Sequence, residues 1–195
     1  MSHATAHTTA SGFLLPSIHS APPFFTRQPN PATQKTATQD WERLILTYAR
    51  HRNLFVLRVE DADAPEGSPW DEILRNPRIN RRMRPAHLAA ILADMVAAGQ
   101  AIYDPPGQTH AALLCWRTPE EWAQILHDWA TATGHLNTIM TLFEIVEPEV
   151  PSALAGLPLP LLHRAIAVLA RAGRAQTIAA ADGEGVRFLQ GAPGR

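Results

Sequence analysis

The sequence has a single cysteine, Cys115, and no excess of charge of either sign. One cysteine cannot form a disulfide within the chain, and its apolar neighbours predict a buried, unreactive thiol in a reducing compartment. With 17 Lys plus Arg against 18 Asp plus Glu, the formal net charge is -1. This balance disfavours a general nucleic-acid binder and a polybasic membrane anchor, because both usually carry a basic excess. No apolar run approaches the ~20 residues that span a bilayer, so we expect a soluble chain.

Residue patterns that support catalysis or metal binding are also missing. The nine histidines show no close pair on one helix face, and there is no CxxC motif that indicates a zinc site. Gly183-Glu184-Gly185 lacks a following Gly-Lys-Ser and does not begin a helix, so it predicts a turn rather than a phosphate-binding loop. We therefore expect no enzyme, no cofactor and no metal site.

The chain instead contains two similar series of elements. In each half an amphipathic helix precedes a β-prone run, a loop, a second helix, a glycine and a β-hairpin. Helices followed by a terminal two-stranded hairpin indicate a winged helix, so the predicted fold is α+β with two tandem winged-helix domains. We expect helices over residues 33–52, 85–98, 119–133 and 161–172, β-prone runs over 54–59 and 138–146, and hairpins over 101–116 and 175–189.

The predicted domain boundaries follow from the same series. The first domain covers residues 21–117, and the second covers residues 118–190, beginning at a Thr118 N-cap. Residues 1–20 are mostly Ser, Thr, Ala and His with little apolar pattern, so we expect a disordered tail there. Residues 191–195 form a second, short tail.

Residues 22–31 combine several prolines with two adjacent aromatic residues, Phe24 and Phe25. Proline favours polyproline II geometry, so we expect this segment to be extended rather than helical. The two rings need burial, and they either pack on their own first domain or dock into apolar pockets of a partner. Because a preset backbone lowers the entropy lost on docking, this segment is the best candidate for a protein contact.

Winged helices often bind DNA through the second helix of the turn, which here is residues 85–98. That helix has no Lys or Arg, whereas a DNA reader needs several phosphate contacts and commonly a base-reading Arg or Asn. A nucleic-acid-binding or transcription-associated protein therefore stays as the alternative function. The basic residues that precede the helix are Arg75, Arg78, Arg81, Arg82 and Arg84.

Four stretches follow one another from residue 22 to residue 188 in a series that is specific when taken together. In this order they resemble the family of vacuolar protein sorting-associated protein 25, the small subunit of the ESCRT-II complex. The stretches are residues 22–30 (PPFFTRQPN), 116–122 (WRTPEEW), 141–145 (TLFEI) and 182–188 (DGEGVRF).

The resemblance implies that the first domain binds the two larger ESCRT-II subunits, vacuolar protein sorting-associated proteins 22 and 36. The proline–aromatic motif is expected to fill hydrophobic pockets on these partners. An arginine within residues 79–83 is expected to form a salt bridge with the partner, and Arg81 matches best; the alternative is a solvated surface arginine that contributes little. The residues carried over from the motif are Pro22, Pro23, Phe24, Phe25 and Pro29.

By the same resemblance, the second domain recruits an ESCRT-III subunit, vacuolar protein sorting-associated protein 20, by binding its N-terminal helix. The chain would then be a cytoplasmic adaptor, recruited to the endosomal membrane with only indirect membrane contact, that sorts ubiquitinated cargo into multivesicular bodies. We expect no nucleic-acid partner. The resemblance does not place the contact residues of the second domain, and residues 147–160 are richer in proline and alanine than the family's usual loop.

Overall fold

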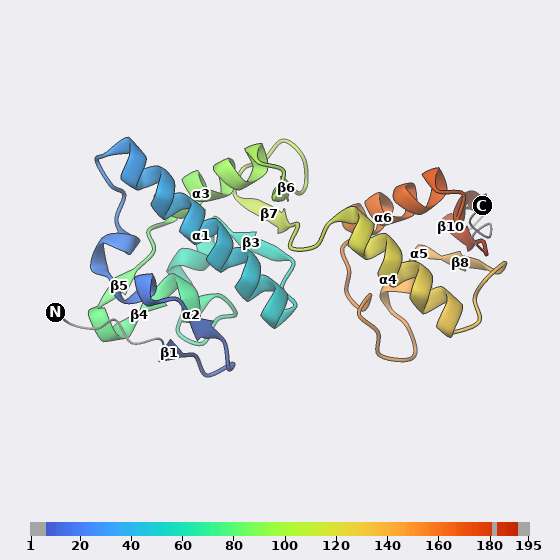
Figure 1. Ribbon diagram of the computed structural model, residues 1–195, viewed down its shortest axis with the longest axis horizontal. Coiled ribbons are helices and arrows are strands. Elements are labelled where there is room, and N and C mark those ends of the chain that lie inside the picture. The colour runs from blue at the N-terminus through green and yellow to red at the C-terminus, as the bar shows by residue number, and fades with distance from the viewer. Residues whose placement is uncertain (1–6, 181–182, 191–195) are drawn as a thin grey trace. The chain divides into compact units, whose positions relative to one another are not determined.

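The computed structural model describes residues 7–180 and 183–190, and the chain divides into two compact units, Met1–Trp116 and Arg117–Arg195 (Figure 1). Within those ranges, no helix combines the length and the apolar character needed to cross a membrane. Each unit has its own helices and its own three-stranded sheet.

The first unit is built on two helices and a sheet. Helix α1 (Pro31–Arg52) begins at Asn30, whose side chain accepts hydrogen bonds from the first-turn N–H groups, and it packs against α3 (Pro85–Ala97). The antiparallel sheet has the order β3–β7–β6, so the strand that follows α1 pairs with the second strand of the hairpin. The strands are β3 (Val56–Arg58), β6 (Ala101–Tyr103) and β7 (Ala111–Leu114).

Short elements fill the rest of the first unit. Between β3 and α3 lie η3 (Val59–Asp63), α2 (Asp71–Leu74), β4 (Arg75–Asn76), η4 (Pro77–Ile79) and β5 (Arg81–Arg82). Before α1 lie β1 (His7–Thr8), β2 (Leu14–Leu15), η1 (Ser17–Ser20) and η2 (Pro22–Phe25).

The second unit repeats this topology. Helices α4 (Pro119–Ala132) and α6 (Leu159–Arg171) pack together, and the sheet order β8–β10–β9 again pairs the strand after the first helix with the last strand. The predicted tandem winged-helix fold is therefore confirmed. The remaining elements are β8 (Ile139–Thr141), α5 (Leu142–Val146), β9 (Ala175–Ala180) and β10 (Gly183–Phe188).

The prediction of a disordered tail at residues 1–20 is wrong for residues 7–20, while residues 1–6 and 191–195 lie outside the described part. Strands β1 and β2 form a hairpin, Leu15 is buried in the core of the first unit, and His19 is also buried. The imidazole Nε2 of His19 lies 2.8 Å from the Ile73 carbonyl oxygen, and Asn76 donates to the His19 carbonyl. Burial lowers the pKa of His19, so a neutral ring suits this site.

Candidate partner-binding sites

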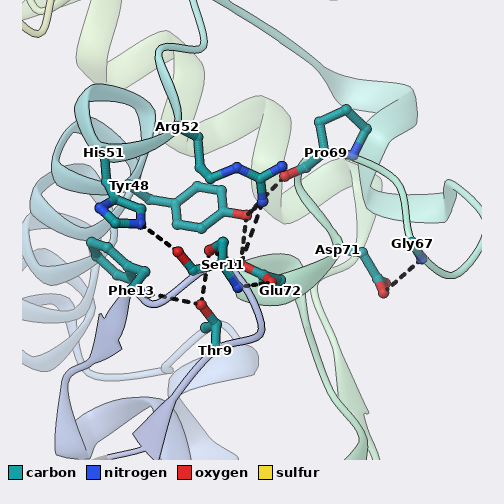
Figure 2. Close-up of polar contacts among 10 residues, drawn as sticks. All are labelled: Thr9, Ser11, Phe13, Tyr48, His51, Arg52, Gly67, Pro69, Asp71 and Glu72. Atoms are coloured by element: carbon teal, nitrogen blue, oxygen red, sulfur yellow. Dashed lines mark hydrogen bonds and ion pairs between the residues drawn. The ribbon is translucent and has the colours of Figure 1, made fainter.

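A polar cluster around Glu72 holds the N-terminal hairpin against the first unit (Figure 2). The Glu72 carboxylate accepts hydrogen bonds from the backbone N–H and the hydroxyl of Ser11. It also accepts one from the Tyr48 hydroxyl at 3.0 Å, and Arg52 lies 3.5 Å from it. Phe13 packs edge-on against the Tyr48 ring. This cluster fixes residues 7–20 in place, which is a structural role.

Acid is expected to weaken this attachment. Burial raises the pKa of Glu72, but hydrogen bonds from Ser11, Thr9 and Tyr48 outweigh it and hold the pKa below its usual value. Glu72 therefore contributes stability above its unfolded pKa of about 4.3, and that stability is lost as the pH falls through the folded pKa. Glu72→Gln should lower the unfolding free energy at neutral pH by about 1–3 kcal/mol. It should also make the unfolding free energy depend less on pH between pH 7 and pH 3.

Urea unfolding measured from pH 7 down to pH 3 tests this expectation. The matched control is Glu60→Gln, because Glu60 is exposed and its nearest cation, Arg58, lies 3.8 Å away. If Glu72→Gln and Glu60→Gln gave the same profile, the Glu72 cluster would not hold the hairpin.

Phe24 and Phe25 lie in the core of the first unit, and each is only 3% exposed. Phe24 stacks on Trp41 with ring centroids 4.2 Å apart, and Phe25 meets the same indole edge-on. The Trp41 Nε1–H donates to the Phe24 carbonyl at 2.9 Å. The two rings are thus buried in their own unit, and the interpretation that they project toward a partner is wrong for this structure. The physical reason is that Trp41 offers them an apolar surface within the chain.

The expected extended conformation of residues 22–31 is also wrong at its beginning, because Pro22–Phe25 form the 3-10 turn η2. Burial of both rings at adjacent positions requires this turn, since an extended strand would point them to opposite sides. Thr26 returns to an extended backbone, and the Gln28 side chain donates to the carbonyls of Pro23 and Thr26.

Other candidate residues from the sequence remain on the surface. Pro22, Pro23 and Pro29 are exposed, and Arg81 is exposed on β5, which packs beside η2. The Arg81 guanidinium donates to the Asn80 carbonyl at 3.1 Å and forms no ion pair within the described part of the chain. The first unit thus places exposed prolines and an available arginine on neighbouring elements.

The second unit has a groove of about 540 Å³ beside α5. Trp129 and Met140 supply apolar surface, and Val150 lines the groove while 70% exposed. Phe143, on α5 next to the groove-lining Glu144, is 63% exposed. An exposed aromatic side chain beside a groove with apolar lining residues is typical of a protein-binding surface. The acidic residues that line the groove are Glu144, Glu147 and Glu149.

Within the described ranges, no group of three or more His, Cys, Asp or Glu side chains is placed to hold a metal ion.

Comparison with known proteins identifies the family. The family model for the ESCRT-II complex subunit matches residues 18–154. This chain belongs to the ESCRT-II complex subunit family. Its relatives include vacuolar protein-sorting-associated protein 25 of Drosophila melanogaster, 33% identical, with 91% of this chain and 98% of that protein covered. The same protein of Danio rerio is 30% identical over 91% of this chain and 99% of its own length.

Solved structures of the ESCRT-II family agree on the fold. A crystal structure of subunit VPS25 of the endosomal trafficking complex ESCRT-II matches with a TM-score of 0.72 and 23% identity, covering 89% of this chain and 98% of that one. A chain of the ESCRT-II complex VPS22/VPS25/VPS36 matches with a TM-score of 0.70 and 22% identity. At this level of identity the structures show the tandem winged-helix fold.

The sequence does not predict the groove of this ESCRT-II family member, because the lining residues come from α4, β8, α5 and the loops that follow α4 and α5. The sequence does contain a local signal for the helix α5 beside the groove. Thr141 and Glu144 form a capping box at the start of α5, and this spacing is visible in the sequence. It places Phe143 within the first turn of a five-residue helix rather than in a strand.

Proposed function

We propose that this chain is a non-catalytic ESCRT-II subunit that links the ESCRT-II core to ESCRT-III during sorting of ubiquitinated membrane cargo into multivesicular bodies. The observation that carries the proposal is the pair of separate surfaces, one on each compact unit. A bridging protein needs two such surfaces. The location that follows is the cytoplasm, with recruitment to the endosomal membrane through the rest of the complex.

The first unit would bind the two larger ESCRT-II subunits, vacuolar protein sorting-associated proteins 22 and 36. The exposed prolines Pro22, Pro23 and Pro29 support this, since rigid backbone loses little entropy on docking. Arg81 supports it too, because its guanidinium is free to form a bidentate pair with a carboxylate of the partner. Phe24 and Phe25 would contribute indirectly, because their burial holds η2 in the conformation that exposes Pro22 and Pro23.

Arg81→Glu is expected to weaken binding of the two larger subunits tenfold or more, or about 1.4 kcal/mol, because it replaces an ion pair by like charges. Isothermal titration calorimetry measures this. Arg50→Glu, an equal charge change on exposed α1 surface, is the control and should bind as the native chain does. Equal affinity of Arg81→Glu and the native chain would remove Arg81 from the interface.

The second unit would bind the ESCRT-III subunit, vacuolar protein sorting-associated protein 20, in the groove beside α5. An amphipathic helix fits a groove whose lining mixes apolar and acidic residues, and three glutamates favour a helix that also carries basic residues. The exposed Phe143 ring and Val150 would supply the apolar contacts.

Phe143→Asp is expected to abolish binding of the ESCRT-III subunit without changing the melting temperature, because the ring is 63% exposed. The control is Leu159→Asp, since Leu159 is also exposed but, unlike Phe143, is not adjacent in the chain to any residue that lines the groove. Fluorescence anisotropy of a labelled N-terminal helix of the ESCRT-III subunit reports the affinity. Native affinity in Phe143→Asp, or equal losses in the two variants, would contradict the placement of the site.

A further inference from the structure

The turn between β1 and β2 is attached to the rest of the first unit through one residue, Ser11. Its backbone N–H donates to Glu72 Oε1 at 2.9 Å, and its hydroxyl donates to Glu72 Oε2. The Ser11 carbonyl oxygen lies 3.0 Å from His51 Nε2 (Figure 2). These three contacts join the turn to α1 and α2.

Ser11 lies in a tight turn at the surface. It is half-buried, and its chain neighbours Ala10 and Gly12 are exposed. The Gly12 N–H donates to the Thr9 carbonyl at 3.0 Å, and Gly12 has a φ of +82°. Strands β1 and β2 have two residues each, and a hairpin this short depends on its tertiary contacts. Local opening that exposes the Ser11 hydroxyl therefore requires much less free energy than unfolding of the unit.

The surroundings of the Ser11 hydroxyl suit a hydrogen-bond donor and disfavour an anion. Burial raises the pKa of Glu72, but hydrogen bonds from its neighbours hold that pKa below its usual value, so Glu72 is ionised at neutral pH. The Arg52 guanidinium lies 3.5 Å from Glu72 and also donates to the Tyr48 hydroxyl at 2.9 Å. This cation is thus already shared between two acceptors, and a second anion at Ser11 would face the Glu72 carboxylate directly.

The segment that carries Ser11 has no charge of its own to compensate an added anion. Residues 7–26 contain no Asp, Glu, Lys or Arg. The family model begins at residue 18, so Ser11 precedes the part of the chain that this model matches. The hairpin can therefore detach without removing an element that the family model covers.

We propose that Ser11 is a phosphorylation site, and that its phosphorylation detaches residues 7–15 from α1 and α2. A protein kinase would transfer the γ-phosphoryl group of ATP to Ser11 Oγ. The Oγ–P bond forms, the bond from the γ-phosphorus to the β–γ bridging oxygen breaks, ADP leaves, and the hydroxyl proton passes to the base of the kinase. The site does not depend on the proposed adaptor function.

Phosphorylation would trap the detached hairpin. The attached hairpin directs the Ser11 hydroxyl to Glu72, so a kinase reaches this hydroxyl when the hairpin opens. Reattachment would then bring a phosphate with a charge of nearly two against an ionised carboxylate, which is repulsive and removes a donor from Glu72. Detachment withdraws Phe13 from the Tyr48 ring and Leu15 from the core.

The effect on the hairpin is tested on the full chain with phosphoserine incorporated at position 11 by genetic code expansion. Hydrogen exchange of the amides of residues 7–15 should be at least tenfold faster than in the unmodified chain. The matched control carries phosphoserine at position 17, because Ser17 is exposed in η1. Exchange in this control should stay close to that of the unmodified chain.

A second background separates charge repulsion from steric bulk. In Glu72→Gln, phosphoserine at position 11 should accelerate exchange by a smaller factor than in the native background, because the like charge is gone. Equal acceleration by phosphoserine at positions 11 and 17 would overturn the proposal. So would an acceleration factor at position 11 that is the same with and without the Glu72 carboxylate.

Use of the site is tested on the chain purified from the cells that naturally make it, after treatment with a phosphatase inhibitor. Trypsin releases a fragment that ends at Arg27, and fragmentation in the mass spectrometer locates any phosphate within it. Phosphate on Ser11, lost in Ser11→Ala, is the expected result. A fragment without phosphate, or with phosphate on Thr9 or Ser17 alone, would contradict the assignment to Ser11.

Discussion

Replacing Phe24 with alanine is expected to lower the unfolding free energy of the first unit by about 3–5 kcal/mol. The ring is 3% exposed and stacks on Trp41 with an interplanar angle of 2°, so truncation leaves a cavity and removes a stacked aromatic pair. The Trp41 indole N–H resonance, followed during urea unfolding, reports on this unit alone.

Pro23→Ala is the control for Phe24→Ala, because Pro23 is an exposed neighbour in the same turn and should change stability by at most about 1 kcal/mol. An unchanged unfolding midpoint in Phe24→Ala would show that the ring leaves the core in solution. Phe24 would then be available to fill a pocket on a partner, as the family resemblance implies.

The measured stability of Phe24→Ala also decides how binding experiments on residues 22–31 are interpreted. If Phe24 belongs to the core, weaker partner binding by Phe24→Ala reflects loss of the η2 turn that presents Pro22 and Pro23. Binding by variants at the exposed prolines then measures the contact itself, because those variants leave the core intact.

The Trp122→Ala variant is expected to destabilise the second unit by about 3–5 kcal/mol. Trp122 is 2% exposed in α4, which packs on α6, and the Arg117 guanidinium lies 4.9 Å from the ring centroid. Truncation therefore removes core packing and a cation–π contact together. Hydrogen exchange of amides in α6 measures the opening of this unit.

Gln124→Ala, on the exposed face of the same helix, is the control and should change stability by about 0.5 kcal/mol or less. Unchanged exchange in α6 of the Trp122→Ala variant would mean that the buried face of α4 has been assigned wrongly. Exchange in α1, which belongs to the other unit, should stay at its native rate.

The sequence predicts the regular elements well because their signals are local. Apolar periodicity predicts α1, α3, α4 and α6 to within a few residues at each end, and glycines mark several helix ends. The Thr118 capping box predicts the start of α4, and the structure contains both of its hydrogen bonds.

Elements that depend on distant contacts could not be predicted in this way. Residues 7–20 have a composition typical of disorder, yet Ser11 bonds to Glu72 and His19 to Ile73, contacts that span more than fifty positions. The same limit applies to Phe24. A proline–aromatic segment has one sequence pattern whether its rings enter their own core or a partner's pocket, and here contacts with Trp41 and His19 place them in their own core.

The candidate sites show the same difference between features with a local signal and features that depend on distant contacts. The family resemblance implies Arg81, which the structure places on the surface, whereas the groove beside α5 depends on residues from several elements. The β-branched and apolar residues of 138–146 favour a strand, but the Thr141 cap begins a helix within that run. Exposure of Phe143 then follows from a helix too short to bury all its apolar residues.

The most direct test of the adaptor function is a bridging experiment with purified components. The two larger ESCRT-II subunits are immobilised, and capture of vacuolar protein sorting-associated protein 20 is measured with and without this chain. The account predicts capture only when the chain is present, and its loss with either Arg81→Glu or Phe143→Asp. Capture that does not need the chain, or that survives both substitutions in a folded chain, would contradict it.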